Sequence, residues 1–412
     1  MSNSPRFYGW TIAVTLWVTY LLGVGLSFYG ASVINAAMGR ALQLDKTTIG
    51  IGFSTASLVW GFSGPLVALM LNRIGVRYTI TIGSLIIAAG AFALGLFVAD
   101  GWGFIAAFGV VIGLGLGLAT NIPAQTGVTL WFNKKRALVI SLVMTASGIG
   151  GFLAPPLLTR IIAGADWRAA WLTVGVACLA CAAIAAVFLR DRPSDLGQWP
   201  DGTPPSEGDV ATHASTAWAP RDVLRSAAFW KMLVGGIVFA APAPLLIAHG
   251  VSHLEGLGHS AATAAWAIGL MLLCSVPGRV LAGVLCDRYS PRHVWAGMLL
   301  LMTAGIAVVV SAHSGLEIGV FAVLLGVGYG GSLISWVSMT AKYFGPTSFA
   351  TVMGMQTPLS TLAVSAVPTL AGVLYDQVGS FSLALWGVGA AALLGALLIT
   401  TVSAPKVTPA LA

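Results

Sequence analysis

The hydrophobicity of the chain rises in long blocks of apolar and small side chains, separated by short polar junctions. A block of about 20 apolar residues is long enough to cross the ~30 Å hydrocarbon layer of a bilayer as an α-helix. The pattern predicts twelve such spans. They cover residues 8–37, 48–71, 77–98, 102–130, 137–162, 168–189, 228–253, 261–286, 293–312, 317–341, 349–374 and 382–402.

The composition supports the same interpretation. Of the 412 residues, 57% are hydrophobic and only 8% are charged, and the mean hydropathy is +0.91. A soluble domain carries about a quarter charged residues. The 51 glycines indicate closely packed helices, because small residues let helix backbones approach in lipid. We therefore expect an all-α polytopic membrane protein embedded in the lipid bilayer.

The net charge of +7 reflects topology and does not imply a nucleic-acid partner. Fifteen Lys and Arg residues fall on one side of the predicted spans and four on the other, which places both termini in the cytoplasm by the positive-inside rule. The fifteen are Arg6, Arg73, Arg77, Lys134, Lys135, Arg136, Arg190, Arg192, Arg221, Arg225, Lys231, Arg288, Arg292, Lys342 and Lys406. Short loops and short termini favour the inner (plasma) membrane of a prokaryote.

The two halves of the chain repeat each other. A polar, proline-containing segment predicts a cytoplasmic linker at 191–225, with six spans before it (1–190) and six after it (226–412). The glycine run Gly113–Gly117 corresponds to Gly326–Gly330, at an offset near 213 residues. A six-plus-six parallel duplication predicts two pseudo-symmetric six-helix bundles, the major facilitator fold, with substrate near the midplane between them.

Arg279 is the one cation predicted deep inside a span. It lies eight residues before Asp287, which places it about 12 Å inside the cytoplasmic boundary. Such a charge must face water or a partner, and a guanidinium matches a carboxylate bidentately. An internal ion pair is the alternative, but no Asp or Glu falls in the middle of a predicted span. The sequence therefore predicts that Arg279 binds a small organic anion.

Five further residues are candidates for the substrate site. Asn121 and Tyr329 can donate hydrogen bonds from spans 4 and 10, Phe28 and Tyr29 can cover a small apolar tail, and Met144 can shape the pocket. Packing within the helices is an equal alternative for each of them.

His249 and His253 lie four residues apart on span 7, so they can share one helix face. No Cys or acid completes a ligand set in sequence, so no metal site and no cofactor are predicted. A proton-coupling role is proposed for His249, because histidine titrates near neutral pH, and Arg279 would share it. A solvated gate residue is the alternative for His249.

The segment Gly283-Val-Leu-Cys-Asp-Arg-Tyr-Ser-Pro-Arg292 resembles the major facilitator signature GxxxDRxxxR/K. Asp287, Arg288 and Arg292 are therefore candidates for conformational gating, in which Asp287 pairs with a basic residue or a helix N-terminus in one state only. An ordinary capped turn is the alternative. The first half has Asn72 in the position of the acid.

Two segments resemble the monocarboxylate transporter family. Residues 131–151 resemble its signature between spans 4 and 5, with an aromatic pair, a basic cluster and a small-residue helix. Phe7-Tyr-Gly-Trp10 is similar to its first-span motif. In that family and its oxalate-carrying relatives, an arginine in span 8 takes the substrate carboxylate, and Arg279 has that place. The oxalate carriers add a lysine in span 11, where this chain has no cation, so the resemblance implies a monocarboxylate.

The predicted function is secondary active transport of a small monocarboxylate such as lactate or pyruvate, by alternating access of a monomer. A proton is the expected co-substrate, and carboxylate exchange or transport of another small organic anion is the alternative. An enzyme is not predicted, because the spans offer no acid pair and no nucleophile–base set.

Overall fold

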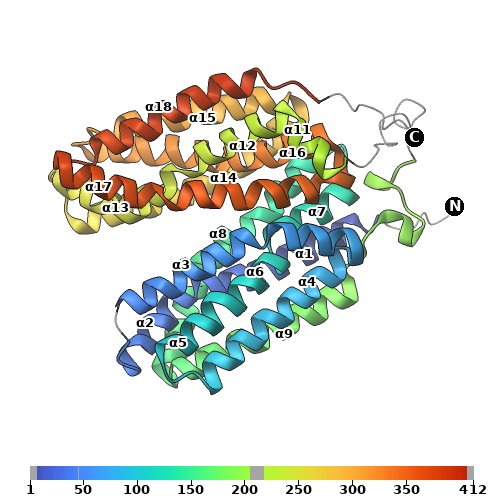
Figure 1. Ribbon diagram of the computed structural model, residues 1–412, viewed down its shortest axis with the longest axis horizontal. Helices are drawn as coiled ribbons and strands as arrows, with labels where there is room; N and C mark the ends of the chain where they lie inside the picture. The colour runs from blue at the N-terminus through green and yellow to red at the C-terminus, as the bar shows by residue number, and fades with distance from the viewer. Residues whose placement is uncertain (1–6, 45, 205–217, 406–412) are drawn as a thin grey trace. The chain divides into compact units, whose positions relative to one another are not determined.

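The computed structural model describes residues 7–44, 46–204 and 218–405, and nearly all of them are helical. They group into two compact units (Figure 1). Unit 1 comprises Met1–Lys134, Leu142–Ala214 and Phe349–Pro358, and unit 2 comprises Lys135–Ser141, Ser215–Ser348 and Leu359–Ala412. Two helices, α8 and α16, therefore contribute residues to both units.

The long helices of each unit run side by side, as Figure 1 shows. The elements from the N-terminus to the middle of the chain are α1 (Gly9–Val24), the π-helical η1 (Gly25–Tyr29), α2 (Ala31–Ala41), α3 (Lys46–Phe62), α4 (Gly64–Leu96), α5 (Gly101–Phe104), the π-helical η2 (Ile105–Ile112), α6 (Gly113–Ala119), α7 (Asn121–Trp131), α8 (Arg136–Gly164), α9 (Trp167–Phe188), and the 3₁₀ turns η3 (Pro193–Leu196) and η4 (Pro200–Gly202). The remainder are α11 (Pro220–Arg225), α12 (Ala227–Ala240), α13 (Pro242–Gly256), α14 (Ala261–Arg288), α15 (Pro291–Val309), α16 (Gly315–Ser365), α17 (Val367–Val378) and α18 (Ser382–Thr400).

The described helices account for the twelve predicted spans once two reversals are taken into account. Ten helices are long and apolar enough to cross a membrane, and Thr48–Phe62 is a shorter apolar one. Gly75 interrupts α4 with φ +81°, and Gly345 interrupts α16 with φ +79°. This left-handed backbone favours glycine. Each of the two helices therefore holds parts of two consecutive spans.

The glycine run of α6 lets three helices meet at backbone distance in unit 1. A Cβ on Gly113 would lie 2.9 Å from the carbonyl oxygen of Ala56 in α3. On Gly115 it would lie 2.8 Å from the backbone nitrogen of Ile87 in α4. Alternate glycines therefore face two different helices, and neither position has room for a side chain.

The corresponding glycines of α16 make the same double contact in unit 2. Gly326 lies against the carbonyl oxygen of Met271 in α14. A Cβ on Gly328 would lie 2.6 Å from the backbone nitrogen of Met302 in α15. The two units thus use equivalent glycines for equivalent contacts, which is the structural counterpart of the repeat in the sequence.

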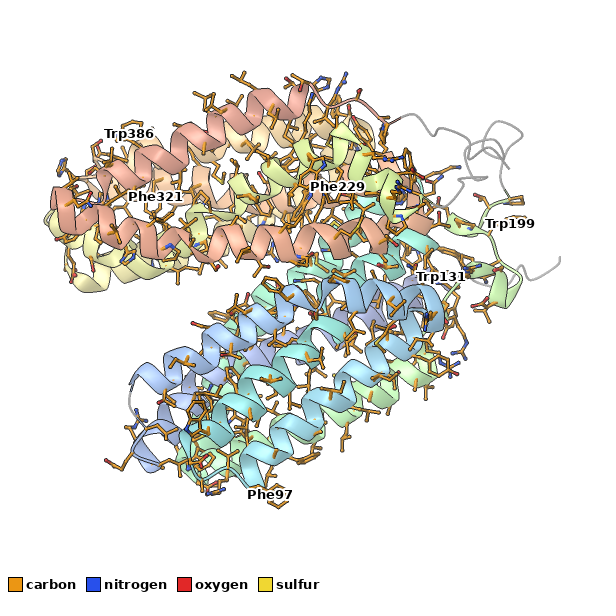
Figure 2. The ribbon with its side chains drawn as sticks, viewed as in Figure 1. Phe97, Trp131, Trp199, Phe229, Phe321 and Trp386 are labelled. Atoms are coloured by element: carbon orange, nitrogen blue, oxygen red, sulfur yellow. The ribbon has the colours of Figure 1, made fainter. Side chains whose placement is uncertain are left out.

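Large apolar side chains cover both the interior and the outside of the units (Figure 2). Trp131, Phe229 and Phe321 are fully buried, whereas Phe97 is 80% exposed and Trp386 is 52% exposed. Exposed apolar surface of this extent on long helices is suited to contact with lipid tails. The opposite faces of the same helices form the packed core.

Basic residues gather at one end of each unit. In unit 1, Arg77, which follows the Gly75 reversal, donates from Nε to the carbonyl of Ala186 near the end of α9 at 2.7 Å. In unit 2, Lys231 and Arg292 both contact the end of α18. We call these the basic ends of the units.

Gly328→Ala should destabilise the protein, because its Cβ meets the backbone of α15, whereas Gly319 of the same helix has no atom within 4 Å of a Cβ. Overpacking of this kind costs about 1–3 kcal/mol. Thermal unfolding in detergent should therefore give a lower Tm for Gly328→Ala and a wild-type Tm for Gly319→Ala. Equal Tm values for the two variants would contradict the assigned contact.

Candidate substrate-binding site and gating contacts

Phe28 and Tyr29 lie on the π-helical segment η1, which interrupts the first span. π-Helical turns expose backbone and often occur at functional sites. The ring of Phe28 joins an aromatic cluster, 5.3 Å from Trp60 and 5.7 Å from Tyr29 between centroids. Tyr29 is 41% exposed and lies against Gly151 of α8. The segment therefore presents Tyr29 at the surface of unit 1 while Phe28 packs half-buried behind it.

Asn121 lies at a break in the fourth span. Thr120 separates α6 from α7 with φ −119° and ψ −112°, and Thr120 does not cap α7 with its side chain. Asn121 is thus the first residue of α7, ten residues before Trp131, or about 15 Å from the basic end. Its Oδ1 accepts a hydrogen bond from the hydroxyl of Tyr20. Half-helix N-termini within a membrane offer backbone N–H groups to anions.

Met144 is buried in α8 and accepts a hydrogen bond from Gln125 of α7, with 3.5 Å between Nε2 and Sδ. Beside it, Trp17 of α1 donates from Nε1 to the hydroxyl of Thr145 at 3.1 Å. Helices α1, α7 and α8 thus share a set of polar contacts within unit 1. We call this set the polar cluster; it comprises Trp17, Tyr20, Asn121, Gln125, Met144 and Thr145.

Only Asn121 and Met144 of this polar cluster are predicted from the sequence. Gln125 follows Asn121 by one helical turn, and that spacing was the one available signal for it. For Tyr20 and Trp17, the sequence contains no feature that distinguishes them from other aromatic residues of an apolar span. Only the packing of three helices shows what the hydroxyl of Tyr20 contacts.

Arg279 is half-buried in α14, two residues after Pro277, and its Nε atom is buried. Directly before Arg279, α14 packs closely against α16: a Cβ on Gly278 would lie 2.5 Å from the carbonyl oxygen of Val327 in α16. Tyr329 follows Val327 by two residues, and its ring lies 5.8 Å from that of Phe239. Arg279 and Tyr329 therefore flank the same glycine contact within unit 2.

His249 and His253 contact different helices. Nε2 of His249 donates to the carbonyl of Pro368 at 3.0 Å, and its ring stacks on Phe381 at 4.7 Å. Nε2 of His253 donates to the carbonyl of Val309 at 3.0 Å. A carbonyl only accepts, so Nε2 carries the proton in both rings. Within the described ranges, no group of three or more His, Cys, Asp and Glu side chains could hold a metal ion.

Asp287 is a residue of α14, and its carboxylate contacts the N-terminus of α8 within unit 2. Its Oδ1 accepts from the backbone N–H of Ala137 at 2.9 Å, and its Oδ2 from that of Leu138 at 3.0 Å. These N–H groups belong to the first helical turn, where a carboxylate is stabilised by the helix dipole. Gly283 permits the approach, because a Cβ there would lie 2.9 Å from the Cβ of Ser141.

Arg288 and Arg292 differ in their surroundings. Arg288 is exposed at the end of α14. Arg292 is half-buried, and its Nη1 lies 3.4 Å from the carbonyl of Val402, just beyond α18. Lys231 donates to the hydroxyl of Thr401 at 2.9 Å. Cations at a helix C-terminus satisfy free carbonyls, so Arg292 anchors the last helix in this structure.

Comparison with known proteins identifies the family. The family model described as Major Facilitator Superfamily matches residues 16–252 and 243–411, which together make up most of the chain. The chain belongs to the major facilitator superfamily. The members of this family are transporters and not enzymes, and the described part of this chain has the long apolar helices of a multi-pass membrane protein.

Several curated relatives are named monocarboxylate transporters. Human monocarboxylate transporter 14 is 31% identical over 211 residues, which are 50% of this chain and 39% of that protein. Rat monocarboxylate transporter 12 is 24% identical over 368 residues, 81% of this chain and 73% of that protein. The chain spans less than half the length of the human and mouse transporter 14 proteins that it matches.

Solved structures share the fold at low sequence identity. The fucose:proton symporter FucP of E. coli is 15% identical with a TM-score of 0.72, covering 96% of this chain and 99% of that one. The proton:xylose symporter XylE is 14% identical with a TM-score of 0.73, covering 95% of each chain. These likenesses show the twelve-helix fold of the superfamily.

The first half of this superfamily member also makes a contact at the position of its altered signature. Asn72, which stands where the acid of the signature belongs, donates from Nδ2 to the hydroxyl of Thr351 at 3.1 Å, within unit 1. A neutral amide on a hydroxyl is weaker than a carboxylate on two N–H groups. The two repeats therefore carry unequal contacts at equivalent positions.

Arg190 and the first part of the linker are docked at the basic end of unit 1. We call residues 190–202 the strap. The carbonyl of Arg190 accepts from Nε1 of Trp131 at 3.0 Å, and Oε1 of Gln198 accepts from the backbone N–H of Tyr8 at 3.0 Å. Asp201 accepts from the backbone N–H groups of Asn133, at 3.1 and 3.2 Å to its two oxygens, and of Lys134, at 2.8 Å.

The connector between α7 and α8 is thus held by two carboxylates. Asp201 binds its first half within unit 1, and Asp287 binds its second half within unit 2. The division between the units falls after Lys134. Lys134 and Lys135 are both exposed, so the connector is accessible to a protease once it opens.

Asp201→Ala should speed tryptic cleavage at Lys134 and Lys135 by about 10- to 100-fold, because hydrogen bonds to a carboxylate contribute about 1.5–3 kcal/mol. Limited trypsinolysis of purified protein followed by mass spectrometry measures the rate. Asp201→Asn keeps one acceptor oxygen, so its cleavage rate should lie between those of the wild type and Asp201→Ala. Asp222→Ala, in the first turn of α11, is the control; faster cleavage in that variant would show that the effect is not specific to the contact of Asp201.

Proposed function

We propose that this chain is a secondary active transporter of small monocarboxylates such as lactate or pyruvate, and that Arg279 binds the substrate carboxylate. The observation that carries the proposal is the position of this residue. Arg279 lies eight residues from Asp287, about 12 Å along α14, and is still partly exposed. A guanidinium at such depth in a membrane helix is a functional-site hypothesis by default.

The chemistry of arginine fits an anionic cargo. Arginine keeps its charge in proteins, and its planar fork matches the two oxygens of a carboxylate. Binding of a monocarboxylate neutralises the site, which lowers the cost of carrying it through a closed intermediate. Residues 349–374, the predicted span 11, contain no Lys or Arg that could pair with a second carboxylate. The relatives named monocarboxylate transporters support the same substrate class.

The other candidate residues would orient the substrate. Oδ1 of Asn121 is engaged by Tyr20, so Asn121 would offer Nδ2 as a donor. Tyr329 beside the Arg279 contact would offer its hydroxyl, and Phe28, Tyr29 and Met144 would enclose the apolar part. Asn121 lies about 15 Å from the basic end of unit 1 and Arg279 about 12 Å from that of unit 2, so both lie at similar depth in their spans.

Alternating access would proceed by rocking of the bundles 1–190 and 226–412 about the linker 191–225. The pair formed by Asp287 and the α8 N-terminus would hold one state and break in the other, and Arg288 and Arg292 of the same signature would be the further gating residues. The Lys and Arg distribution supports an orientation with the basic ends and the termini in the cytoplasm. The short loops suit a plasma membrane. The transporter would act as a monomer.

Proton-coupled symport is our first choice for the coupling, with His249 and Arg279 as the groups involved. Carboxylate exchange is the second candidate, and transport of another small organic anion is the third. The surroundings of His249 limit its part in the coupling, because its Nε2 donates to the carbonyl of Pro368 and its ring is stacked on Phe381. A histidine held in this way has only Nδ1 to exchange a proton.

Arg279→Gln should reduce uptake of labelled lactate into proteoliposomes by about 30-fold or more, since loss of one partner of a charged hydrogen-bonded pair costs about 2–5 kcal/mol. Arg279→Lys keeps the charge but not the fork, and should also be impaired. Arg221→Gln, an exposed arginine of α11, is the control. Wild-type flux in Arg279→Gln would refute the proposed role.

Symport and exchange give different responses to external lactate. If a proton accompanies the substrate, lactate added to empty proteoliposomes should make the outside alkaline, with about one proton per lactate. If the protein exchanges carboxylates, uptake should require lactate inside and leave the external pH unchanged. A pH electrode and counterflow of labelled lactate measure both quantities on the same preparation.

A further inference from the structure

Gln125 is a buried amide whose hydrogen-bonding capacity is poorly used. Its side chain is 3% exposed. Nε2 donates to the thioether of Met144 at 3.5 Å, and Oε1 is buried without a hydrogen-bond partner among the described residues. A thioether is a weak acceptor, and a buried amide oxygen without a donor is unfavourable. An orphan acceptor of this kind requires an explanation.

Packing alone does not explain a glutamine at this position. Ala124 and Val128 beside it are buried and apolar, and the buried hydroxyls of Thr126 and Thr129 donate to backbone carbonyls of α7 itself, so neither pairs with the amide oxygen. A methionine of nearly the same length, or a leucine, would fill the site without leaving an orphan oxygen. The polar group is therefore retained at a cost in stability, which is typical of residues that serve a ligand.

The position of Gln125 connects it to the candidate substrate site. It follows Asn121 by four residues, so the two side chains lie on one face of α7, about 6 Å apart along the axis. Met144, which occupies the amide, is an unbranched and flexible side chain that can swing away. Displacement of the thioether would free Nε2, so that both Nε2 and Oε1 could bind a ligand.

We propose that Gln125 is a specificity-determining residue that accepts a hydrogen bond from the hydroxyl group of a 2-hydroxy monocarboxylate. This inference rests on the proposed function and narrows its substrate class. Oε1 can only accept, so the ligand must bring a donor. A lactate-like acid brings an O–H beside its carboxylate, whereas a 2-keto acid brings another acceptor and an unsubstituted acid brings none.

A site built around a substrate hydroxyl discriminates against analogues that lack it. The analogue leaves the amide oxygen desolvated and unpaired, and this cost is absent with the hydroxy acid. An ammonium donor is less suited to this position, because a neutral amide does not compensate a buried charge. Lactate should therefore bind better than propionate, which has the same carbon chain without the hydroxyl.

Competition against labelled lactate uptake in proteoliposomes tests the inference. For the wild type, we expect the half-inhibitory concentration of propionate to exceed that of lactate by about 10-fold or more. Gln125→Leu should bring this ratio to within about twofold of one, chiefly through weaker lactate binding. Gln377→Leu, which replaces an exposed glutamine of α17, should keep the wild-type ratio.

The outcomes separate this inference from the proposed function. Transport of lactate and propionate with equal preference by the wild type would leave the proposed function intact and overturn the role of Gln125, as would an unchanged ratio in Gln125→Leu. Absence of any monocarboxylate binding in the wild type would overturn the proposed function itself. Gln125→Met, which keeps the side-chain volume without the amide, provides the same comparison if the leucine variant is poorly folded.

Discussion

In hydrocarbon, each backbone N–H and C=O group must find its partner within the protein, and this constraint governs the whole structure. Long uninterrupted helices meet it, and most of the described chain consists of them. The exceptions are informative because each has a cost. The first span changes to a π-helical segment at Gly25–Tyr29, and the fourth is π-helical at Ile105–Ile112 and broken at Thr120. The candidate residues Phe28 and Tyr29 lie in the first of these places, and Asn121 follows the break at Thr120.

Without water to drive helices together, close packing has to hold them, and glycine supplies it. In α6 and in the equivalent part of α16, alternate glycines touch two neighbouring helices at backbone distance. The same contact that brings α14 against α16 at Gly278 fixes the helical positions of Arg279 and Tyr329. Packing and the placement of the candidate binding groups are therefore one property of the fold.

Carboxylates at the basic ends complement this packing. Asp287 and Asp201 hold successive parts of the α7–α8 connector through backbone N–H groups, and Asp191 accepts from the backbone N–H of Arg77 after the Gly75 reversal. Backbone donors at helix starts suit this purpose because they are free and carry the positive end of the helix dipole. The acids thus join chain segments far apart in sequence.

The sequence by itself determined the membrane class, the number of spans and the twofold repeat, because hydrophobic length and glycine spacing are local properties. The role predicted for Arg279 rests on an equally local signal, an isolated charge, and stays a prediction. The sequence also indicated that Asp287 could meet a helix N-terminus. The merging of spans at Gly75 and Gly345 and the docking of the strap were decided by tertiary structure. Tertiary structure also decided the polar cluster around Gln125. A hydrogen bond between two helices depends on which helix faces meet, and the spacing of apolar residues does not specify the partner of a single polar side chain.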